Sequence, residues 1–175
     1  MSDSTPLAVG DRVPDVGAPL VRSDGSAEET PLSELLEERP VLLCFYTNDF
    51  APDCVNEWCS FRDYEWFSAN PSVTLVGAST SRPVTHRKFM DLLDLSFPMY
   101  ADTDLEIAEA FGVDYRAFRL LARSRRSCFL IDQDRTIRHR WLADHAIDPT
   151  MDTPDVGALH DAVVETFGDG FEAES

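Results

Sequence analysis

The chain of 175 residues has few basic side chains, and only one of them, Lys88, is a lysine. Lys and Arg together number 15 against 32 Asp and Glu, which gives a formal net charge of −17 at pH 7. Nucleic acid and anionic membrane are therefore excluded as expected partners, because both are negatively charged. Self-repulsion of this size destabilises a compact state unless salt screens it. The composition favours a protein that works in a very salty cytoplasm, with an ordinary acidic protein as the alternative.

Long hydrophobic runs are also missing. The longest strongly apolar run, Val41 to Tyr46, is far too short to span a membrane. The N-terminal stretch MSDSTPLAVGD has no basic region and no apolar core, so it does not resemble a signal peptide. We therefore expect a soluble, cytoplasmic protein, a setting in which thiols stay reduced and functional cysteines are catalytic or metal-binding.

The patterns that are present predict a single α/β domain over residues 1–175, with an ordered core at about 9–168 and acidic termini. A loop is expected at Ser23 to Thr30. The closing helix is expected to bury Val156, Leu159, Val163, Val164 and Phe167. Strands are expected at 41–46, 73–79, 96–102, 127–132 and 136–143, and helices at 31–38, 52–68, 84–94, 104–112 and 155–167.

Cysteine is scarce, with four in the chain, yet Cys54 and Cys59 stand close together in NDFAPDCVNEWCSFRD. Pro52 predicts the start of a helix, which puts Cys54 in the first turn, where unpaired N–H groups favour a thiolate. Cys59 then lies about 140° around that helix and about 7.5 Å along it. A disulfide allows roughly 4.4 to 6.8 Å between Cα atoms, so a Cys54–Cys59 bond requires the first turns to unwind.

This spacing suggests a thiol switch, and peroxide reduction is a chemistry that needs one. A thiolate attacks the O–O bond and becomes a sulfenic acid, and a second thiol condenses with it to a disulfide. A partner dithiol then reduces that disulfide. From the residues alone, the alternative stays open that Cys54 and Cys59 are small apolar side chains of a helix.

The order of several motifs resembles a known family. FYTNDFAPDCVNEWCSFRD resembles the active-site segment of peroxiredoxins, in the branch named after bacterioferritin comigratory protein. VGDRVPD, GAST, THRKF, FPMYADTDLEIAEAFGV and RRSCFLID match in the same order, so the resemblance extends from about Gly10 to Trp141. It implies a thioredoxin-like α/β fold, with a central mixed β-sheet flanked by helices and the peroxiredoxin N-terminal extension.

The resemblance also implies roles for individual residues. Cys54 resembles the peroxidatic cysteine and Cys59 the resolving cysteine. Arg126 resembles the active-site arginine, whose guanidinium would hold the thiolate and the peroxide oxygens. Arg125 is the alternative if the register is off by one residue. Glu57 lies where the family often has Glu, and is expected to bond to active-site backbone or to cap the helix.

Two positions depart from the family pattern of Pro, three residues, Thr or Ser, two residues, Cys. The proline position is Thr47 and the hydroxyl position is Ala51. The family hydroxyl aligns the peroxide, and alanine cannot form that hydrogen bond. Losing one such contact costs roughly 2 to 4 kcal/mol in the transition state, or tens to several hundredfold in rate. The departures therefore indicate a slow peroxidase, one tuned to another oxidant, or a sensor that kept only the thiol switch.

The remaining candidates receive structural roles. Cys44 lies in the apolar run and is expected in the core, and Cys128 is expected to pack rather than react. His86 matches a family histidine, for which a surface or packing role is expected. A metal site built from the four cysteines lacks any C-x2-C or H-x3-H pair, so no metal is expected.

The leading hypothesis is a thiol-dependent peroxidase that reduces hydrogen peroxide or organic hydroperoxides without metal, haem or flavin. A thioredoxin-like dithiol protein is its expected reductant, and the expected assembly is a monomer or weak dimer. The alternative is a thioredoxin-fold redox sensor or interaction protein with little turnover, which Thr47 and Ala51 favour. A dithiol exchanger is a third, weaker possibility.

Overall fold

A central β-sheet organises the chain. The computed structural model describes residues 6–46, 58–61, 73–117, 121–142 and 156–167. Residues 58–61 form one short helical segment. The other elements, in chain order, are β1 (Gly17–Val21), β2 (Ala27–Pro31), α1 (Leu32–Leu36), β3 (Val41–Phe45), β4 (Thr74–Ser79), α4 (Pro83–Leu93), β5 (Met99–Ala101), α5 (Glu106–Phe111), β6 (Asp114–Ala117), β7 (Leu121–Ser124), β8 (Ser127–Ile131), β9 (Ile137–Leu142) and α6 (Val156–Phe167).

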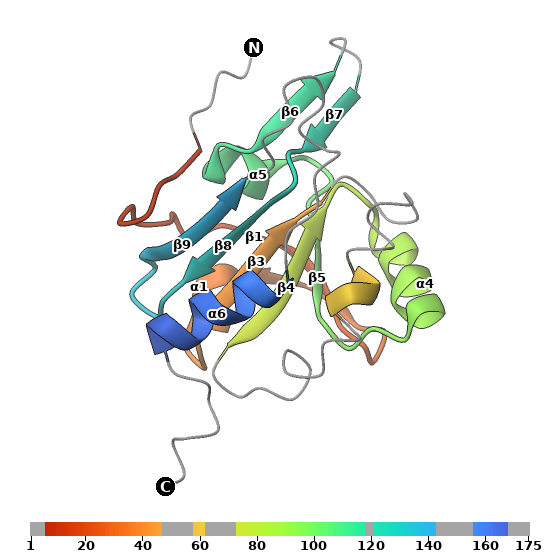
Figure 1. Cartoon of the computed structure of the whole chain (residues 1–175). Helices are drawn as coiled ribbons and strands as arrows, with labels where there is room; N and C mark the ends of the chain where they lie inside the picture. The colour runs from red at the N-terminus through yellow and green to blue at the C-terminus, as the bar shows by residue number, and fades with distance from the viewer. Residues whose placement is uncertain (1–5, 47–57, 62–72, 118–120, 143–155, 168–175) are drawn as a thin grey trace, which may run out of the picture.

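The main sheet is mixed, as predicted. Its seven strands follow the order β2-β1-β5-β4-β3-β8-β9, and β6 pairs with β7 as a separate hairpin (Figure 1). Strand β3 pairs in parallel with β4 and antiparallel with β8, while β4 and β5 are parallel. The expected hairpin of two strands before the last helix is confirmed as the antiparallel pair β8–β9.

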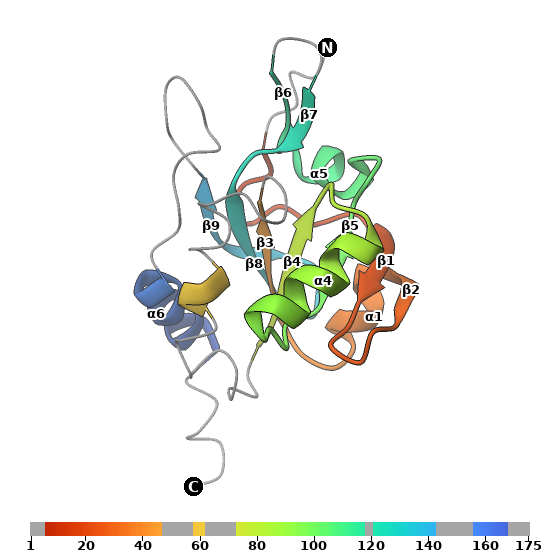
Figure 2. The ribbon, with the colours of Figure 1, turned by 90° about the vertical axis from the view of Figure 1, so that its right-hand side faces the viewer.

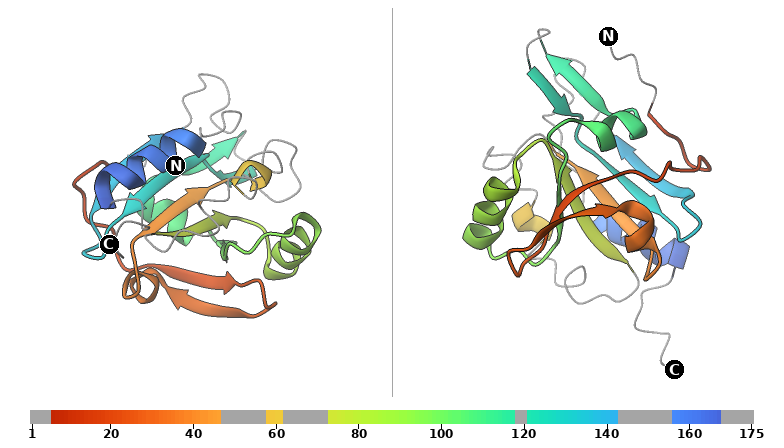
Figure 3. Two further views of the ribbon diagram at one scale, coloured as in Figure 1. Left: turned by 60° about the horizontal axis from the view of Figure 1, so that its bottom comes forward. Right: turned by 180° about the vertical axis from the view of Figure 1, so that it is seen from behind.

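Two hydrophobic cores cover the two faces of this sheet. One core joins Leu43 and Phe45 of β3 to α1 and α5, and the other joins Cys44 and Tyr46 to α4, α6 and the segment 58–61. Figure 2 shows the helices on opposite sides of the sheet, and the view from behind in Figure 3 has α1 and α5 in front. A strand buried on both faces has a continuous apolar sequence, which is why VLLCFY predicts this strand correctly.

The helix ends follow local signals. Pro83 lies in the first turn of α4, where its missing N–H costs no helical hydrogen bond. Helix α5 ends at Gly112, as predicted, and this residue has φ of +74° in the left-handed region that glycine tolerates. Asp102 caps α5 from outside, accepting hydrogen bonds from the backbone N–H groups of Ile107 (3.0 Å) and Ala108 (2.9 Å).

Several expectations were wrong. The loop expected at Ser23 to Thr30 is a short turn followed by β2, which pairs with the unpredicted β1. Strand β2 has exposed acidic side chains at a sheet edge, so its sequence lacks the apolar pattern of a buried strand. The β6–β7 hairpin was not predicted either. In α6, Leu159 and Val163 are buried as expected, but Val164 is only partly buried and lies outside the core cluster.

Candidate functional site

Tyr46 and Arg126 mark one end of the central strands. Strands β3 and β4 are parallel, so their carboxyl ends share an edge of the sheet, and Tyr46 follows β3 directly. In the β3–β8 register Phe45 lies opposite Ser127, so Tyr46 and Arg126 flank the same end of that strand pair. Open α/β sheets bind ligands beyond the carboxyl ends of their strands. A reaction centre is therefore expected at this end of the sheet.

Tyr46 is held by a buried hydrogen-bond network. Its hydroxyl lies 3.3 Å from Nδ1 of His86 and 3.3 Å from Sδ of Met99. Nε2 of His86 lies 3.1 Å from the carbonyl oxygen of Tyr100, which can only accept, so Nε2 carries the donated hydrogen. In the neutral ring Nδ1 is then an acceptor, so Nδ1 and Sδ of Met99 share the single hydroxyl hydrogen of Tyr46. The network fixes the residue that leads into the cysteine-bearing segment.

Trp58 anchors the other end of that segment. Its ring centroid lies 5.4 Å from that of Tyr46, in an edge-to-face arrangement, and 5.2 Å from that of Phe61. A Cβ atom at Gly77 of β4 would lie 2.7 Å from Cζ2 of Trp58, so only glycine admits the indole here. The indole nitrogen of Trp58 is buried without a hydrogen-bond partner among the described residues, so packing is the force that holds it.

The contact between Tyr46 and Trp58 brings together the two residues that border positions 47–57. Four of the predicted site residues, Thr47, Ala51, Cys54 and Glu57, lie in that interval and outside the described residues. Cys59 is described: it follows Trp58 in the helical segment 58–61 and is partly exposed. The predicted resolving cysteine thus follows the anchoring Trp58 directly in the same helical segment.

Arg126 and Arg125 differ in their surroundings. Arg126 is only 1% exposed, whereas Arg125 is partly exposed and its backbone N–H donates to the carbonyl oxygen of Val113 (2.6 Å). A guanidinium buried at the sheet end concentrates positive charge where water screens it little. Such a group suits a thiolate or a polarised peroxide oxygen. Of the two arginines, the burial favours Arg126.

Metal chemistry has no evident ligand set in the described part of the chain. There, no group of three or more His, Cys, Asp or Glu side chains is arranged to hold a metal ion. Cys44 and Cys128 are buried, as expected for core residues.

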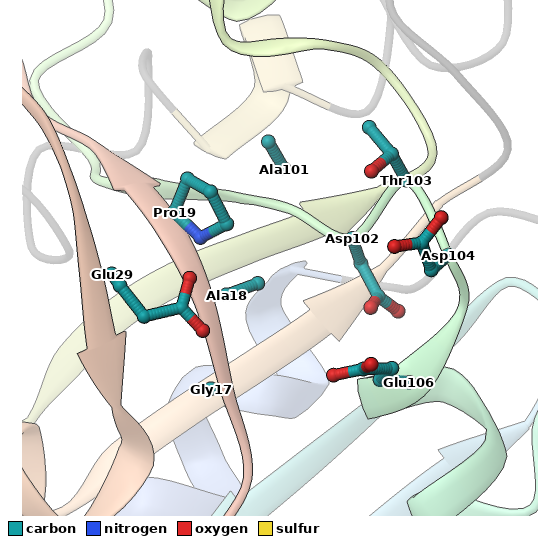
Figure 4. Close-up of a pocket in the computed structure, with 9 residues that line it drawn as sticks. All are labelled: Gly17, Ala18, Pro19, Glu29, Ala101, Asp102, Thr103, Asp104 and Glu106. Atoms are coloured by element: carbon teal, nitrogen blue, oxygen red, sulfur yellow. The ribbon is translucent and has the colours of Figure 1, made fainter.

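A hollow with an acidic lining lies at another part of the sheet, away from Cys59 and Arg126. Its volume is about 170 Å³, and Figure 4 shows its lining residues, which are Gly17, Ala18, Pro19, Glu29, Ala101, Asp102, Thr103, Asp104 and Glu106. Burial raises the pKa of Asp102, against the two backbone hydrogen bonds that it accepts. The lining has four carboxyl groups and no basic side chain, so it does not suit an anionic reactant. Cys59 and Arg126 are not part of it.

Sequence reasoning missed the residues that support the site. His86 was expected at the surface or in packing; it is fully buried and bonds Tyr46, so only the packing part was right. Gly77 belongs to the quoted GAST motif, but only its contact with Trp58 shows that this position has no room for a side chain. A buried histidine inside a helix and a glycine inside a strand are the signals that could have found them.

Comparisons with known proteins agree with this geometry. The family model described as AhpC/TSA family matches residues 9–140. A Mycobacterium tuberculosis protein provisionally named a peroxiredoxin is 30% identical over 146 residues, covering 83% of this chain and 92% of the relative. Peroxiredoxin Bcp of Escherichia coli is 29% identical over 159 residues, covering 81% and 99%.

Solved structures give the same result for the fold. The crystal structure of peroxidoxin BcpB from Mycobacterium tuberculosis superposes with a TM-score of 0.72 and 26% identity, covering 90% of this chain and 95% of that one. A peroxiredoxin-like protein from Aquifex aeolicus superposes with a TM-score of 0.76 at 20% identity, covering 92% and 88%, and supports the fold alone. Among the described helices, none has the length and apolar character needed to cross a membrane. The chain belongs to the AhpC/TSA family and shares the thioredoxin-like fold of its peroxiredoxin neighbours.

Proposed function

We propose that this protein is a thiol-dependent peroxidase that reduces hydrogen peroxide or organic hydroperoxides. The observation that carries the proposal is the Tyr46–Trp58 contact, because it borders the interval with Cys54 at the sheet end where Arg126 is buried. The family match over residues 9–140 includes both cysteines and this arginine.

Each step has a candidate residue. The Cys54 thiolate attacks one peroxide oxygen, the O–O bond breaks, and the leaving alkoxide or hydroxide takes up a proton. Arg126 would stabilise the negative charge that moves from sulfur to the leaving oxygen. Cys59 then attacks the sulfenic sulfur and expels water, which leaves a Cys54–Cys59 disulfide. Glu57 would support the backbone of this segment.

The disulfide must be reduced for turnover, and we assign that step to a thioredoxin-like dithiol protein of the cytoplasm. Thiol–disulfide exchange through a mixed disulfide regenerates both thiols. The strong negative charge argues against nucleic acid or anionic membrane as partners. We propose a single domain that works as a monomer or weak dimer, without metal or other cofactor.

Stopped-flow measurement of peroxide consumption tests the proposal, with the reduced protein and an excess of a dithiol reductant. We expect turnover in the wild type and none in Cys54→Ser. Cys59→Ser is the matched control, and it is measured without reductant. It should then consume one equivalent of peroxide and form a sulfenic acid, because the nucleophile remains and the resolving thiol does not. Equal turnover in wild type and Cys54→Ser would contradict the assignment.

The alternative is a redox sensor with negligible turnover, and the observation that favours it is Ala51 at the family hydroxyl position. Restoring the hydroxyl in Ala51→Thr should raise the peroxidase rate by tens to several hundredfold, from roughly 2 to 4 kcal/mol of transition-state stabilisation. Ala51→Val is the matched control, since valine has the same shape as threonine but lacks the hydroxyl. If Thr and Val behave alike while the wild type forms its disulfide without turnover, the sensor is the better description.

A further inference from the structure

Cys44 and Cys128 form a second pair of cysteines, on two neighbouring strands of the sheet. They come from distant parts of the chain, yet they are direct partners in the antiparallel register of β3 and β8. Cys44 is 0% exposed and Cys128 is 1% exposed. Both belong to the core beneath α4 and α6, so their side chains leave the same face of the sheet. Figure 1 shows β3 and β8 side by side, with β9 beyond β8 at the edge of the sheet.

The hydrogen-bond pattern of β3 sets the distance between them. The carbonyl oxygen of Pro40 accepts from the N–H of Thr74 (2.9 Å), and the N–H of Tyr46 donates to the carbonyl oxygen of Ala78 (3.0 Å). The N–H and C=O groups of one residue point to the same side of a strand, and this side alternates from one residue to the next. The even-numbered residues of β3 therefore direct their N–H and C=O groups toward β4. The peptide groups of Cys44 therefore face away from β8.

It follows that Cys44 and Cys128 are a non-hydrogen-bonded pair of the β3–β8 ladder. In such pairs the Cα atoms are about 4.5 Å apart and the side chains approach most closely. Disulfides occur at Cα separations of roughly 4.4 to 6.8 Å. The two thiols thus stand at a separation that a disulfide accepts without a shift in strand register. The hydrogen-bonded neighbours of this pair, such as Phe45 and Ser127, are spaced more widely.

We propose that Cys44 and Cys128 are a second redox couple, separate from Cys54 and Cys59, which hydroperoxides oxidise to an intramolecular disulfide between β3 and β8. One thiol loses its proton and attacks the peroxide, taking one oxygen while the O–O bond breaks and an alcohol or water leaves. The second thiol then attacks the sulfenic sulfur, the S–S bond forms, and water leaves with the transferred oxygen. Two thiols and one hydroperoxide thereby give one disulfide, one alcohol and one water.

Burial sets the conditions under which this couple reacts. Peroxide reaches Cys44 and Cys128 only through local opening of the sheet end, so the couple is oxidised more slowly than the partly exposed Cys59. The new bond would lie two residues from Tyr46, which follows β3, and two residues from Arg126, which precedes β8. It would link β3 and β8 covalently next to the proposed reaction centre. Sustained exposure to peroxide would therefore leave a disulfide beside that centre.

The test uses the full chain with Cys54→Ser and Cys59→Ser, in which Cys44 and Cys128 are the remaining cysteines. The folded protein is exposed to hydrogen peroxide, then denatured and alkylated, and its thiols are counted by intact mass. We expect both thiols to disappear with a loss of two hydrogens, without added oxygen, in a monomer whose digest contains a Cys44–Cys128 linked peptide. Adding Cys128→Ser to this background is the matched control and should abolish the linked peptide.

Two results would overturn the proposal. One is that both thiols remain alkylatable after sustained peroxide exposure, continued well beyond the time that fully oxidises Cys54 and Cys59 in the wild type. The other is that oxidation yields only sulfinic acid or links between two chains. If circular dichroism shows that the double variant does not fold, the linked peptide is sought in the oxidised wild type instead. Its absence there counts equally against the couple, whatever the outcome of the peroxidase assay.

Discussion

At the scale of single residues, the packing beside the candidate site depends on the absence of a side chain at Gly77. Gly77 leaves room on β4 for the Trp58 indole, and Trp58 positions the helical segment with Cys59. A methyl group at position 77 would lie 2.7 Å from Cζ2 of Trp58, closer than carbon atoms approach. Trp58 is fully buried, so it cannot swing into solvent at low cost.

We therefore predict that Gly77→Ala lowers the free energy of unfolding by about 1 to 3 kcal/mol, the usual cost of overpacking a core. It should also slow resolution of the sulfenic acid, because Cys59 moves with Trp58. Urea unfolding and the rate of disulfide formation measure the two effects. Adding Trp58→Phe should recover part of the loss from Gly77→Ala, since the smaller ring avoids the added methyl. Strictly additive effects would show that the two residues do not compete for space.

Tyr46 illustrates how a residue outside the motif can matter for it. Its hydroxyl is bonded within the core to His86, and its ring contacts Trp58. Nothing in its local sequence distinguishes it from any aromatic residue at the end of a buried strand. Its position becomes informative once α4 and the segment 58–61 are packed over the same face of the sheet.

At the scale of elements, β9 and α6 carry a titration that affects stability. Burial lowers the pKa of His139 on β9 from its ordinary value of 6.5, and the charge of Glu165 on α6 opposes this shift. The folded protein therefore binds this proton less readily than the unfolded chain. As the pH falls below 6.5, the unfolded chain is protonated first, so the free energy of unfolding decreases. Well above 6.5 the imidazole is neutral in both states and the effect disappears.

We predict that His139→Gln makes the decrease in stability between about pH 7 and pH 5.5 less steep, because glutamine does not titrate. Glu165→Gln should make that decrease steeper, since it removes the charge that favours the protonated imidazole. Urea unfolding across this pH range measures both slopes. The same slope in the wild type and in His139→Gln would contradict the assignment to this residue.

At the scale of the whole molecule, the net charge of −17 dominates. Like charges repel throughout a compact chain, and salt screens them over a Debye length of about 10 Å at 0.1 M and about 3 Å at 1 M. The exposed acidic side chains of β2 and α1 contribute to this field. A compact state with this charge should gain more from added salt than a nearly neutral protein does.

We predict that the thermal unfolding midpoint rises between low salt and about 1 M KCl. The triple variant Glu37→Gln, Glu38→Gln and Asp91→Asn, which removes three exposed negative charges, is the matched control and should show a smaller rise. Differential scanning calorimetry measures both proteins. A midpoint that stays level or falls with salt in the wild type would contradict adaptation to a salty environment.

The sequence by itself determined the features that depend on neighbours along the chain. The apolar run at β3 predicted a buried strand, Gly112 predicted the end of α5, and the spacing of strands and helices predicted the α/β sheet. Cys54, Cys59 and Arg126 were also predicted as site residues from the sequence, through motifs that resemble a family. These signals are local, because the periodicity of apolar residues, the turn residues and the spacing of motifs all depend on neighbouring positions in the sequence.

Only the tertiary structure decided which distant residues meet. The β1–β2 and β6–β7 hairpins escaped prediction, since β2, β6 and β7 are edge strands and their sequences lack a strong apolar pattern. The contact of Tyr46 with Trp58, the space above Gly77, and the pairing of Cys44 with Cys128 depend on strand order and register. Register is fixed when the whole sheet and its two cores close together, and no stretch of sequence contains that information alone.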